Sequence, residues 1–170
     1  MISAIVYNSK TGSCKKYAEM LSAKLAVPAF PYGDSHVRQE GQVIYVSWVM
    51  AGSVVGYAKA AKEMNIAAVV AVGMAPVAEN SVESGRSKNK IPADVAFFCR
   101  QGGFHMDKLP LPMRMIMKLK VKDIAKQLES KKASGSLDAQ EQAMYRMATT
   151  GVGEPAEWKV DDIVAWAKNS

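Results

Sequence analysis

Several features are absent from this sequence, and each absence removes a class of protein. No run of about 18 consecutive apolar residues occurs, so we expect no membrane-spanning helix. No basic stretch precedes an apolar one near Met1, so we expect no signal peptide. The two cysteines, Cys14 and Cys99, are too few for a disulfide framework and lack metal-ligand spacing. Together these absences favour a cytoplasmic, reduced protein without a metal site.

The remaining composition is that of an ordinary globular protein, with 170 residues, 49% of them hydrophobic and 22% charged. This length predicts a single domain, 1–170, with a core that needs no covalent staples. Apolar, β-branched runs alternate with segments of helical periodicity, which predicts an α/β protein with parallel strands. The predicted strands are 2–7, 27–32, 43–49, 67–72 and 95–99, and the predicted helices begin near 14, 54, 79, 112, 137 and 161. Asp161 or Asp162 is expected to cap the last helix.

The polar loop 8–13 follows the first predicted strand and precedes a helix. Ser9, Thr11 and Ser13 supply hydroxyl groups there, and Gly12 allows the backbone to approach a ligand closely. The loop matches neither the Walker pattern nor the dinucleotide fingerprint. The residues alone leave two interpretations open. One is a phosphate site at a helix N-terminus, and the other is a turn with a hydroxyl cap.

Three stretches in the same order resemble a known family. Residues 5–18 resemble the FMN-phosphate signature of flavodoxins, [ST]-x-T-G-x-T, and residues 48–56 match the flavodoxin loop after the third strand. Residues 97–109 are similar to the flavodoxin-domain branch related to menaquinone-dependent protoporphyrinogen oxidase. The resemblance implies a flavodoxin-like three-layer sandwich, with a five-stranded parallel sheet of order 2-1-3-4-5 and helices on both faces. It also implies FMN at the switch point of the sheet, an arrangement of which flavodoxin is the standard example.

The resemblance further implies which residues hold the cofactor. The implied FMN-binding residues are Ser9, Lys10, Thr11, Gly12, Ser13 and Cys14 in the phosphate loop, Trp48, Val49, Met50, Ala51 and Gly52 beside the flavin ring, and Arg100, Gln101, Gly102 and Gly103, whose amides would meet the pyrimidine edge. Trp48 could instead be a core or rim aromatic, and the Gly102–Gly103 pair could serve only a backbone turn.

Cys14 departs from the signature, because a second Thr is expected there. The loss of one hydroxyl bond to a charged group, worth about 1.5–3 kcal/mol, could weaken FMN binding. Cys14 also lies in the first turn of a helix, where a thiol pKa tends to fall, and on that helix's apolar stripe. We favour a buried, inert thiol over a redox-active one. No catalytic residue is assigned: His36 is expected to be solvated, and His105 is either structural or catalytic.

The segment 106–132 is strongly basic, with eight bases against three acids, and so contributes +5 of the net charge of +6. Its apolar stripe is predicted at Met113, Met117, Val121, Ile124 and Leu128, while Met115 and Leu119 fall outside that stripe. Three interpretations stay open. The segment is a solvated helix, a surface for anionic lipid or a quinone, or a patch for an acidic redox partner.

We therefore predict an FMN-dependent oxidoreductase of the protoporphyrinogen oxidase type, or one linked to a quinone. The alternatives are a non-enzymatic electron carrier and a flavodoxin-fold domain with weakened FMN binding. The expected partners are FMN and a redox protein, a quinone or a porphyrin-type substrate, and no nucleic acid partner is expected. The expected location is the cytoplasm, with or without peripheral contact between 106–132 and an anionic membrane.

Overall fold

The chain forms two compact units in the computed structural model, which describes residues 1–37, 41–74 and 76–170. The first unit comprises 1–102 and 157–170, and the second comprises 103–156. The sequence predicted one domain, 1–170, without this subdivision. Each unit contains its own cluster of buried apolar side chains.

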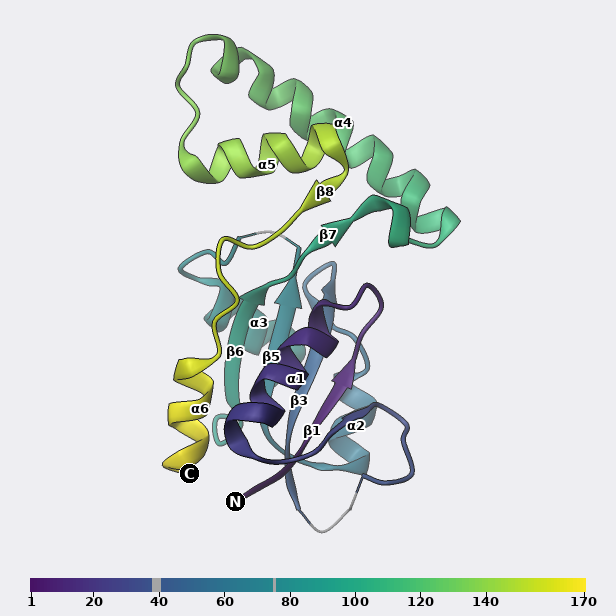
Figure 1. The fold of residues 1–170 in the computed structure, drawn as a ribbon, viewed down its shortest axis with the longest axis vertical. Helices are drawn as coiled ribbons and strands as arrows, with labels where there is room; N and C mark the ends of the chain where they lie inside the picture. The colour runs from purple at the N-terminus through teal and green to yellow at the C-terminus, as the bar shows by residue number, and fades with distance from the viewer. Residues whose placement is uncertain (38–40, 75) are drawn as a thin grey trace. The chain divides into compact units, whose positions relative to one another are not determined.

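The first unit is built on a mostly parallel sheet (Figure 1). Its parallel strands are β1 (Ile2–Asn8), β2 (Ala29–Pro31), β3 (Gln42–Met50), β5 (Asn65–Gly73) and β6 (Ala96–Gln101), and they follow one another as β2-β1-β3-β5-β6. This order differs from the predicted 2-1-3-4-5 because the chain inserts a short strand, β4 (Ser53–Val54), which pairs antiparallel with β3. The turn between β3 and β4 has positive φ at Ala51 (50°) and Gly52 (81°). Two consecutive left-handed residues are what a tight hairpin requires.

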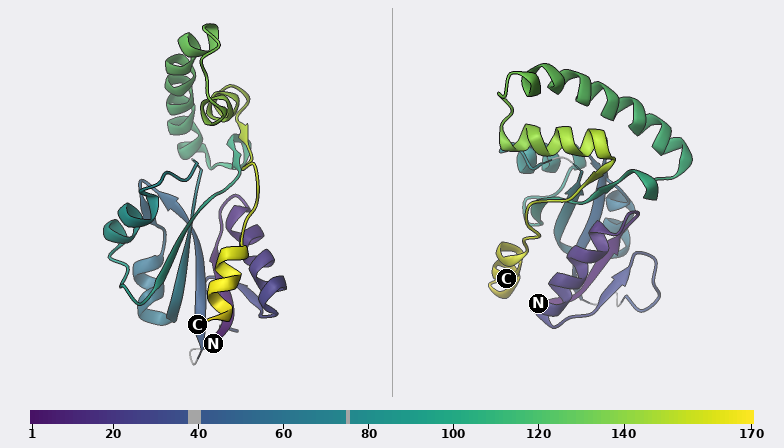
Figure 2. Two further views of the ribbon diagram at one scale, coloured as in Figure 1. Left: turned by 90° about the vertical axis from the view of Figure 1, so that its left-hand side faces the viewer. Right: turned by 45° about the horizontal axis from the view of Figure 1, so that its top comes forward.

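Helices lie on both faces of this sheet (Figure 2). On one face, α1 (Ser13–Leu25) and α6 (Asp161–Lys168) bury Leu21 and Ile163 against Ile5 and Ile44. On the other face, α2 (Tyr57–Glu63) packs Ala60 into a cluster that includes Val6, Tyr45 and Val69. The helix α3 (Ser81–Asn89) lies on that second face, where Gly85 approaches the ring of Phe97. The predicted class, α/β with a mostly parallel sheet flanked by helices, is confirmed.

Several element boundaries differ from the prediction. The helix expected from Val54 begins at Tyr57, because Val54 belongs to β4. The strand predicted at 95–99 is β6, which continues to Gln101. Arg100 and Gln101 therefore lie within this strand rather than after it. The expected cap of the last helix is wrong, because Val160 is the N-cap residue and both acids lie in the first turn of α6. There Asp161 pairs with Lys24 and Asp162 with Arg100, while their charges complement the positive end of the helix.

The second unit is a helical hairpin with a two-stranded ribbon. Its elements are β7 (Phe104–His105), the short helix η1 (Met106–Lys108), α4 (Leu111–Ala133), α5 (Ala139–Thr150) and β8 (Val152–Gly153), with β7 antiparallel to β8. Phe104, Leu109 and Val121 are buried, and methionines including Met147 pack against them. Within the described residues, none of the helices has both the length and the apolar character needed to cross a membrane.

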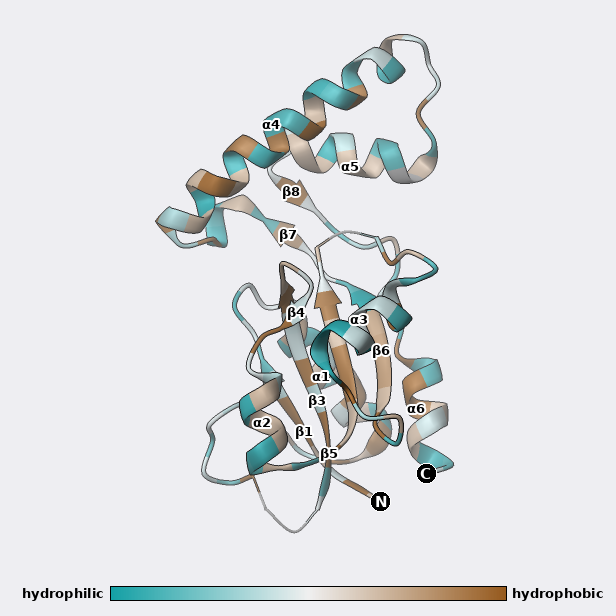
Figure 3. Ribbon diagram, turned by 180° about the vertical axis from the view of Figure 1, so that it is seen from behind, coloured by the Kyte–Doolittle hydropathy of each residue, from teal (hydrophilic) through white to brown (hydrophobic). Residues whose placement is uncertain are grey.

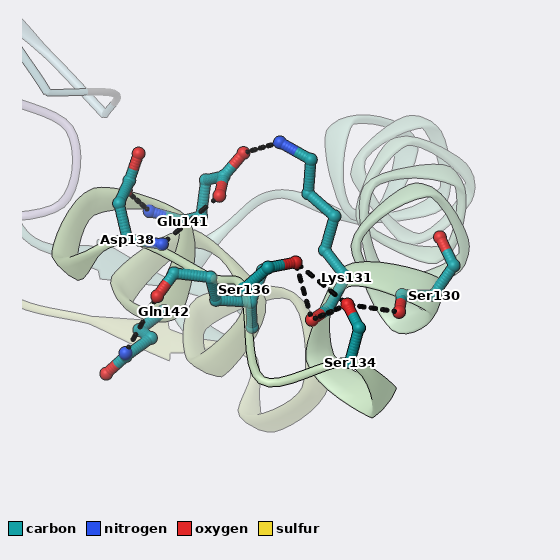
Figure 4. Close-up of polar contacts among 8 residues, drawn as sticks. Ser130, Lys131, Ser134, Ser136, Asp138, Glu141 and Gln142 are labelled. Carbon is teal, nitrogen blue, oxygen red and sulfur yellow. Dashed lines mark hydrogen bonds and ion pairs between the residues drawn. The ribbon is translucent and has the colours of Figure 1, made fainter.

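Polar contacts fix the connection between α4 and α5 (Figure 4). Asp138 accepts a hydrogen bond from the Glu141 amide at 2.7 Å, and the Glu141 carboxylate accepts one from the Asp138 amide at 3.2 Å. This capping box fixes the start of α5. The Lys131 ammonium donates to the Glu141 carboxylate at 2.5 Å, which raises the pKa of Lys131. The hairpin is therefore held by its loop as well as by its core.

Candidate functional site

The candidate site lies at the carboxyl edge of the first unit's sheet. The parallel register pairs Asn8 with Ser47, Trp48 with Val72, and Gly73 with Gln101. Because neighbouring parallel strands end at the same edge, the loops after β1, β3 and β5 and the end of β6 meet there. This is the edge at which open α/β sheets bind ligands.

The loop between β1 and α1 presents a helix N-terminus without a side-chain cap at the N-cap position. Gly12 is the N-cap residue and has φ of 101°, a left-handed conformation that favours glycine. A Cβ atom built on Gly12 would meet no heavy atom of the described residues within 4 Å. Gly12 has no side chain with which to cap the helix, so any hydroxyl that serves the turn comes from another residue of the loop. The first amides of a helix have no partner within the helix, and a helix N-terminus of this kind is suited to an anion.

Ser9 supplies the most informative atom of this loop. Its Oγ is buried and has no hydrogen-bond partner among the described residues. A buried polar atom without a partner costs about 1–3 kcal/mol, so native structures rarely retain one without a reason. A ligand oxygen in the loop would satisfy this hydroxyl. Ser9 therefore carries a signal for a ligand that the sequence motif alone did not distinguish.

Lys10 and Trp48 bring two of the loops together. The Lys10 ammonium lies 5.2 Å from the centroid of the Trp48 ring, within the range of a cation–π interaction. Trp48 is also partly buried against the core on the α1 face of the sheet. This burial fits a core or rim aromatic, and a flavin could stack on the ring face that Lys10 covers only if Lys10 moved. Lys10 adds positive charge beside the phosphate loop.

The two cysteines lie on opposite faces of the sheet. Cys14 is 2% exposed in the core beneath α1, whereas Cys99 packs against the cluster on the other face. Both are free thiols. Burial raises the pKa of Cys14 to about 12 despite its place in the first turn of a helix. The prediction of a buried thiol is confirmed, and the pKa is raised rather than lowered because desolvation outweighs the hydrogen bond to the backbone.

The turn at Ala51 and Gly52, the predicted wall beside the flavin, is held by the end of α3. The Lys88 ammonium donates to the Ala51 carbonyl at 2.5 Å. The Asn89 side chain donates to the Gly52 carbonyl at 3.1 Å, and its Oδ1 accepts from the Val54 amide at 2.7 Å. Sequence analysis did not identify Lys88 or Asn89, since a polar helix carries no signal for a distant turn. The adjacent Val49 is partly buried and Met50 half-exposed.

The predicted residues of the pyrimidine edge, 100–103, lie at the end of β6 and just after it. Arg100 donates to the Lys159 carbonyl at 2.9 Å and pairs with Asp162, so its side chain is used to hold α6. The Gly102 amide donates to the Gly73 carbonyl at 2.7 Å. The Gly102 amide thus extends the pairing of β5 with β6, and a contact between Gly102 and a flavin stays a prediction.

Gly102 is needed for a different reason. A Cβ atom there would lie 3.0 Å from Ser13 Oγ and 2.8 Å from Val72 Cγ1. The end of β6 is also tied to α1, because the Tyr17 hydroxyl donates to the Gln101 carbonyl at 2.7 Å. Gly102 therefore allows the sheet edge to approach the phosphate loop. Gly103 belongs to the second unit.

Each histidine has a carboxylate partner within its own unit. The His36 side chain is 77% exposed, as expected of a solvated histidine, and its Nδ1 lies 2.7 Å from Asp34 Oδ1. Hydrogen bonds from His36 hold the pKa of Asp34 below its usual value. His105 Nε2 lies 2.8 Å from Glu154 Oε1 within the second unit. Among the described residues, no three His, Cys, Asp or Glu side chains lie together as metal ligands.

Comparisons with models of protein families, with curated proteins and with solved structures gave no match.

Proposed function

We propose that the first unit binds FMN through the loop 9–13 and transfers electrons through the bound flavin. The observation that carries this proposal is the buried Ser9 hydroxyl, which has no partner in the described part of the chain and precedes the N-terminus of α1, capped by Gly12. An anion site explains both features. The flavodoxin-like signature at residues 5–18 supports FMN as the particular ligand, and with it a flavodoxin-like sandwich.

The chain offers suitable groups for each part of the cofactor. The hydroxyl groups of Ser9 and Thr11 and the first-turn amides of α1 would hold the phosphate, with Lys10 as a nearby cation. The turn at Ala51 and Gly52, fixed by α3, would form a wall beside the flavin ring. When bound, FMN supplies one- and two-electron chemistry, while the protein binds and orients it and tunes its environment. We propose a redox protein, a quinone or a porphyrin-type molecule as the electron acceptor.

The test compares FMN with riboflavin, which lacks the phosphate. Apo-protein should bind FMN saturably, and Ser9→Ala and Thr11→Ala should each weaken FMN by about 10-fold or more, because hydrogen bonds to charged groups are worth about 1.5–3 kcal/mol. Riboflavin affinity should change little in both variants. Ser22→Ala removes a hydroxyl from the last turn of α1, at the opposite end of the helix from the loop. It serves as the matched control and should leave both affinities unchanged.

Two results would overturn the proposal. The first is a lack of saturable FMN binding at high micromolar concentrations. The second is an equal loss of FMN and riboflavin affinity in Ser9→Ala and Thr11→Ala, which would assign these residues to fold stability rather than to phosphate binding.

A further inference from the structure

One side of α4 carries apolar residues that the core of the second unit does not use. Leu111, Met115, Ile116 and Leu119 are 71%, 69%, 58% and 69% exposed. We call these four residues the exposed stripe. An α-helix turns by about 100° per residue, so residues spaced by four and eight lie on the same side of it. The stripe is therefore one continuous surface over the first half of α4.

The opposite side of α4 is the one that forms the core. Val121 is 6% exposed, and Met113 and Met117 pack in the same cluster with Met147 of α5. At about 100° per residue, the centre of this core side lies about 170° around the helix from the centre of the exposed stripe. The helix is thus apolar on two opposite sides, and brown segments recur along α4 in Figure 3. Only one of the two is explained by packing against α5.

The charges of α4 surround the exposed stripe. Seven bases and two acids give the helix a net charge of +5. Three of the bases have contacts within the unit: Arg114 with the Leu109 carbonyl, Lys131 with Glu141, and Lys132 with Tyr145. The other four, Lys118, Lys120, Lys122 and Lys126, are exposed.

The four exposed lysines have defined positions on the helix. Lys118 and Lys120 lie on either side of the stripe, about 90–110° around the helix from its centre. Lys122 and Lys126 lie on the same side of α4 as the stripe, further toward the C-terminal end of the helix. Their long apolar stems allow the ammonium groups to reach beyond an apolar surface beside them.

We propose that the exposed stripe of α4 lies in the surface of an anionic membrane, with its apolar side chains among the acyl chains and the four exposed lysines at the headgroups. A helix with an apolar side flanked by lysines is the form that binds in the plane of an interface. Protein-binding hot spots are enriched in Trp, Tyr and Arg, whereas the stripe consists of Leu, Met and Ile. Lipid is therefore favoured over an acidic protein. This inference does not depend on FMN binding by the first unit.

The first arm of the test measures charge. The whole protein should co-sediment with vesicles of phosphatidylserine and phosphatidylcholine at low salt, but much less with phosphatidylcholine alone. Each lysine near an anionic surface contributes about five-fold to binding. Replacing Lys118, Lys120, Lys122 and Lys126 with Gln should therefore reduce binding on the order of 100-fold or more. The control variant, Lys62→Gln with Lys168→Gln, removes exposed lysines of α2 and α6 instead. It should lower vesicle binding less, per lysine removed, than the replacement of the α4 lysines.

The second arm measures insertion. Met115→Gln with Leu119→Gln should reduce vesicle binding on the order of 10-fold or more even at low salt, because apolar area no longer leaves water. Val82→Gln, at an exposed apolar position of α3, should leave binding unchanged. Far-ultraviolet circular dichroism would verify that each variant is folded. No binding to anionic vesicles would overturn the proposal and assign the stripe to a protein partner. Loss through the lysines alone would also overturn it, since that result means adsorption without insertion.

Discussion

Ser9→Ala should separate the stability of the apo-protein from its affinity for FMN. Most buried serines stabilise a fold through a hydrogen bond, but Ser9 Oγ has no such bond to the described residues. A buried hydroxyl without a partner costs about 1–3 kcal/mol, and replacing it with a methyl group removes that cost. We therefore expect Ser9→Ala to leave the free energy of unfolding of the apo-protein unchanged or to raise it by up to this amount.

The expected effect with FMN has the opposite sign. A ligand that binds the native state adds a stabilisation of RT ln(1 + [L]/Kd), so a 10-fold loss of affinity removes about 1.4 kcal/mol of it at saturating FMN. For a protein of this length, 1 kcal/mol shifts Tm by about 2–4 °C. Ser9→Ala should thus raise or maintain the Tm without FMN and reduce the increase in Tm that FMN produces.

Thermal unfolding with and without FMN measures both effects, and Ser22→Ala is again the matched control. The Ser22 hydroxyl donates to the Val27 carbonyl at 2.6 Å within the same unit. Its removal should lower the Tm of the apo-protein through the loss of about 1 kcal/mol, without changing the FMN-dependent shift. If Ser9→Ala destabilises the apo-protein as Ser22→Ala does, then the Ser9 hydroxyl has a partner in the protein and the reasoning is refuted.

Two further variants probe how the site is supported. Cys14→Thr introduces the residue of the flavodoxin signature. It should lower the free energy of unfolding by about 1–3 kcal/mol without tightening FMN binding, because the new hydroxyl would enter the core. Chemical denaturation and an FMN titration measure the two effects, and tighter FMN binding would contradict the core placement. Asn89→Ala should destabilise the protein by about 1–3 kcal/mol, because it leaves the amide of buried Val54 unpaired. It should also weaken the binding of FMN and of riboflavin equally, because the turn at Ala51 and Gly52 loses a hydrogen bond. Lys88→Ala, at an exposed position, is the milder control, and unequal losses of the two flavins in Asn89→Ala would place Asn89 near the phosphate instead.

The parallel sheet could be predicted because its signal is local. The runs 43–49 and 67–72 are mostly apolar and rich in valine, as expected of strands covered on both faces. The strand β4 could not be predicted from such a signal, since it has two residues. It depends on a left-handed conformation at Ala51, for which alanine has no intrinsic preference.

The separate core of the second unit was missed for a related reason. The periodicity of 112–131 predicted a helix and its apolar stripe, and the structure buries Val121 of that stripe. However, the partners of the stripe, Phe104 and Met147, come from segments before and after the helix. Helical periodicity shows which side of a helix is apolar, but it does not show which distant segment covers that side.

The candidate site divides in the same way. Gly12 and Ser9 belong to one strand–turn–helix segment, so sequence analysis could identify them together. Lys88 and Asn89 act on a turn 37 residues earlier in the chain, and only the packing of α3 brings them there. Gly102 was identified correctly as a residue at the sheet edge, but the sequence carried no signal for the bond of its amide to the Gly73 carbonyl.

Cys14 shows how the structure changes the meaning of a departure from a motif. The sequence suggests that FMN loses a hydroxyl donor there, at a cost of about 1.5–3 kcal/mol. In the structure, the side chain at this position lies in the core with Tyr17 and Leu21, and the residue's amide lies in the first turn of α1. An anion at this helix N-terminus would be bound through amides and through hydroxyls of the preceding loop. The thiol therefore fits the core at this position, and its presence does not argue against the proposed FMN site.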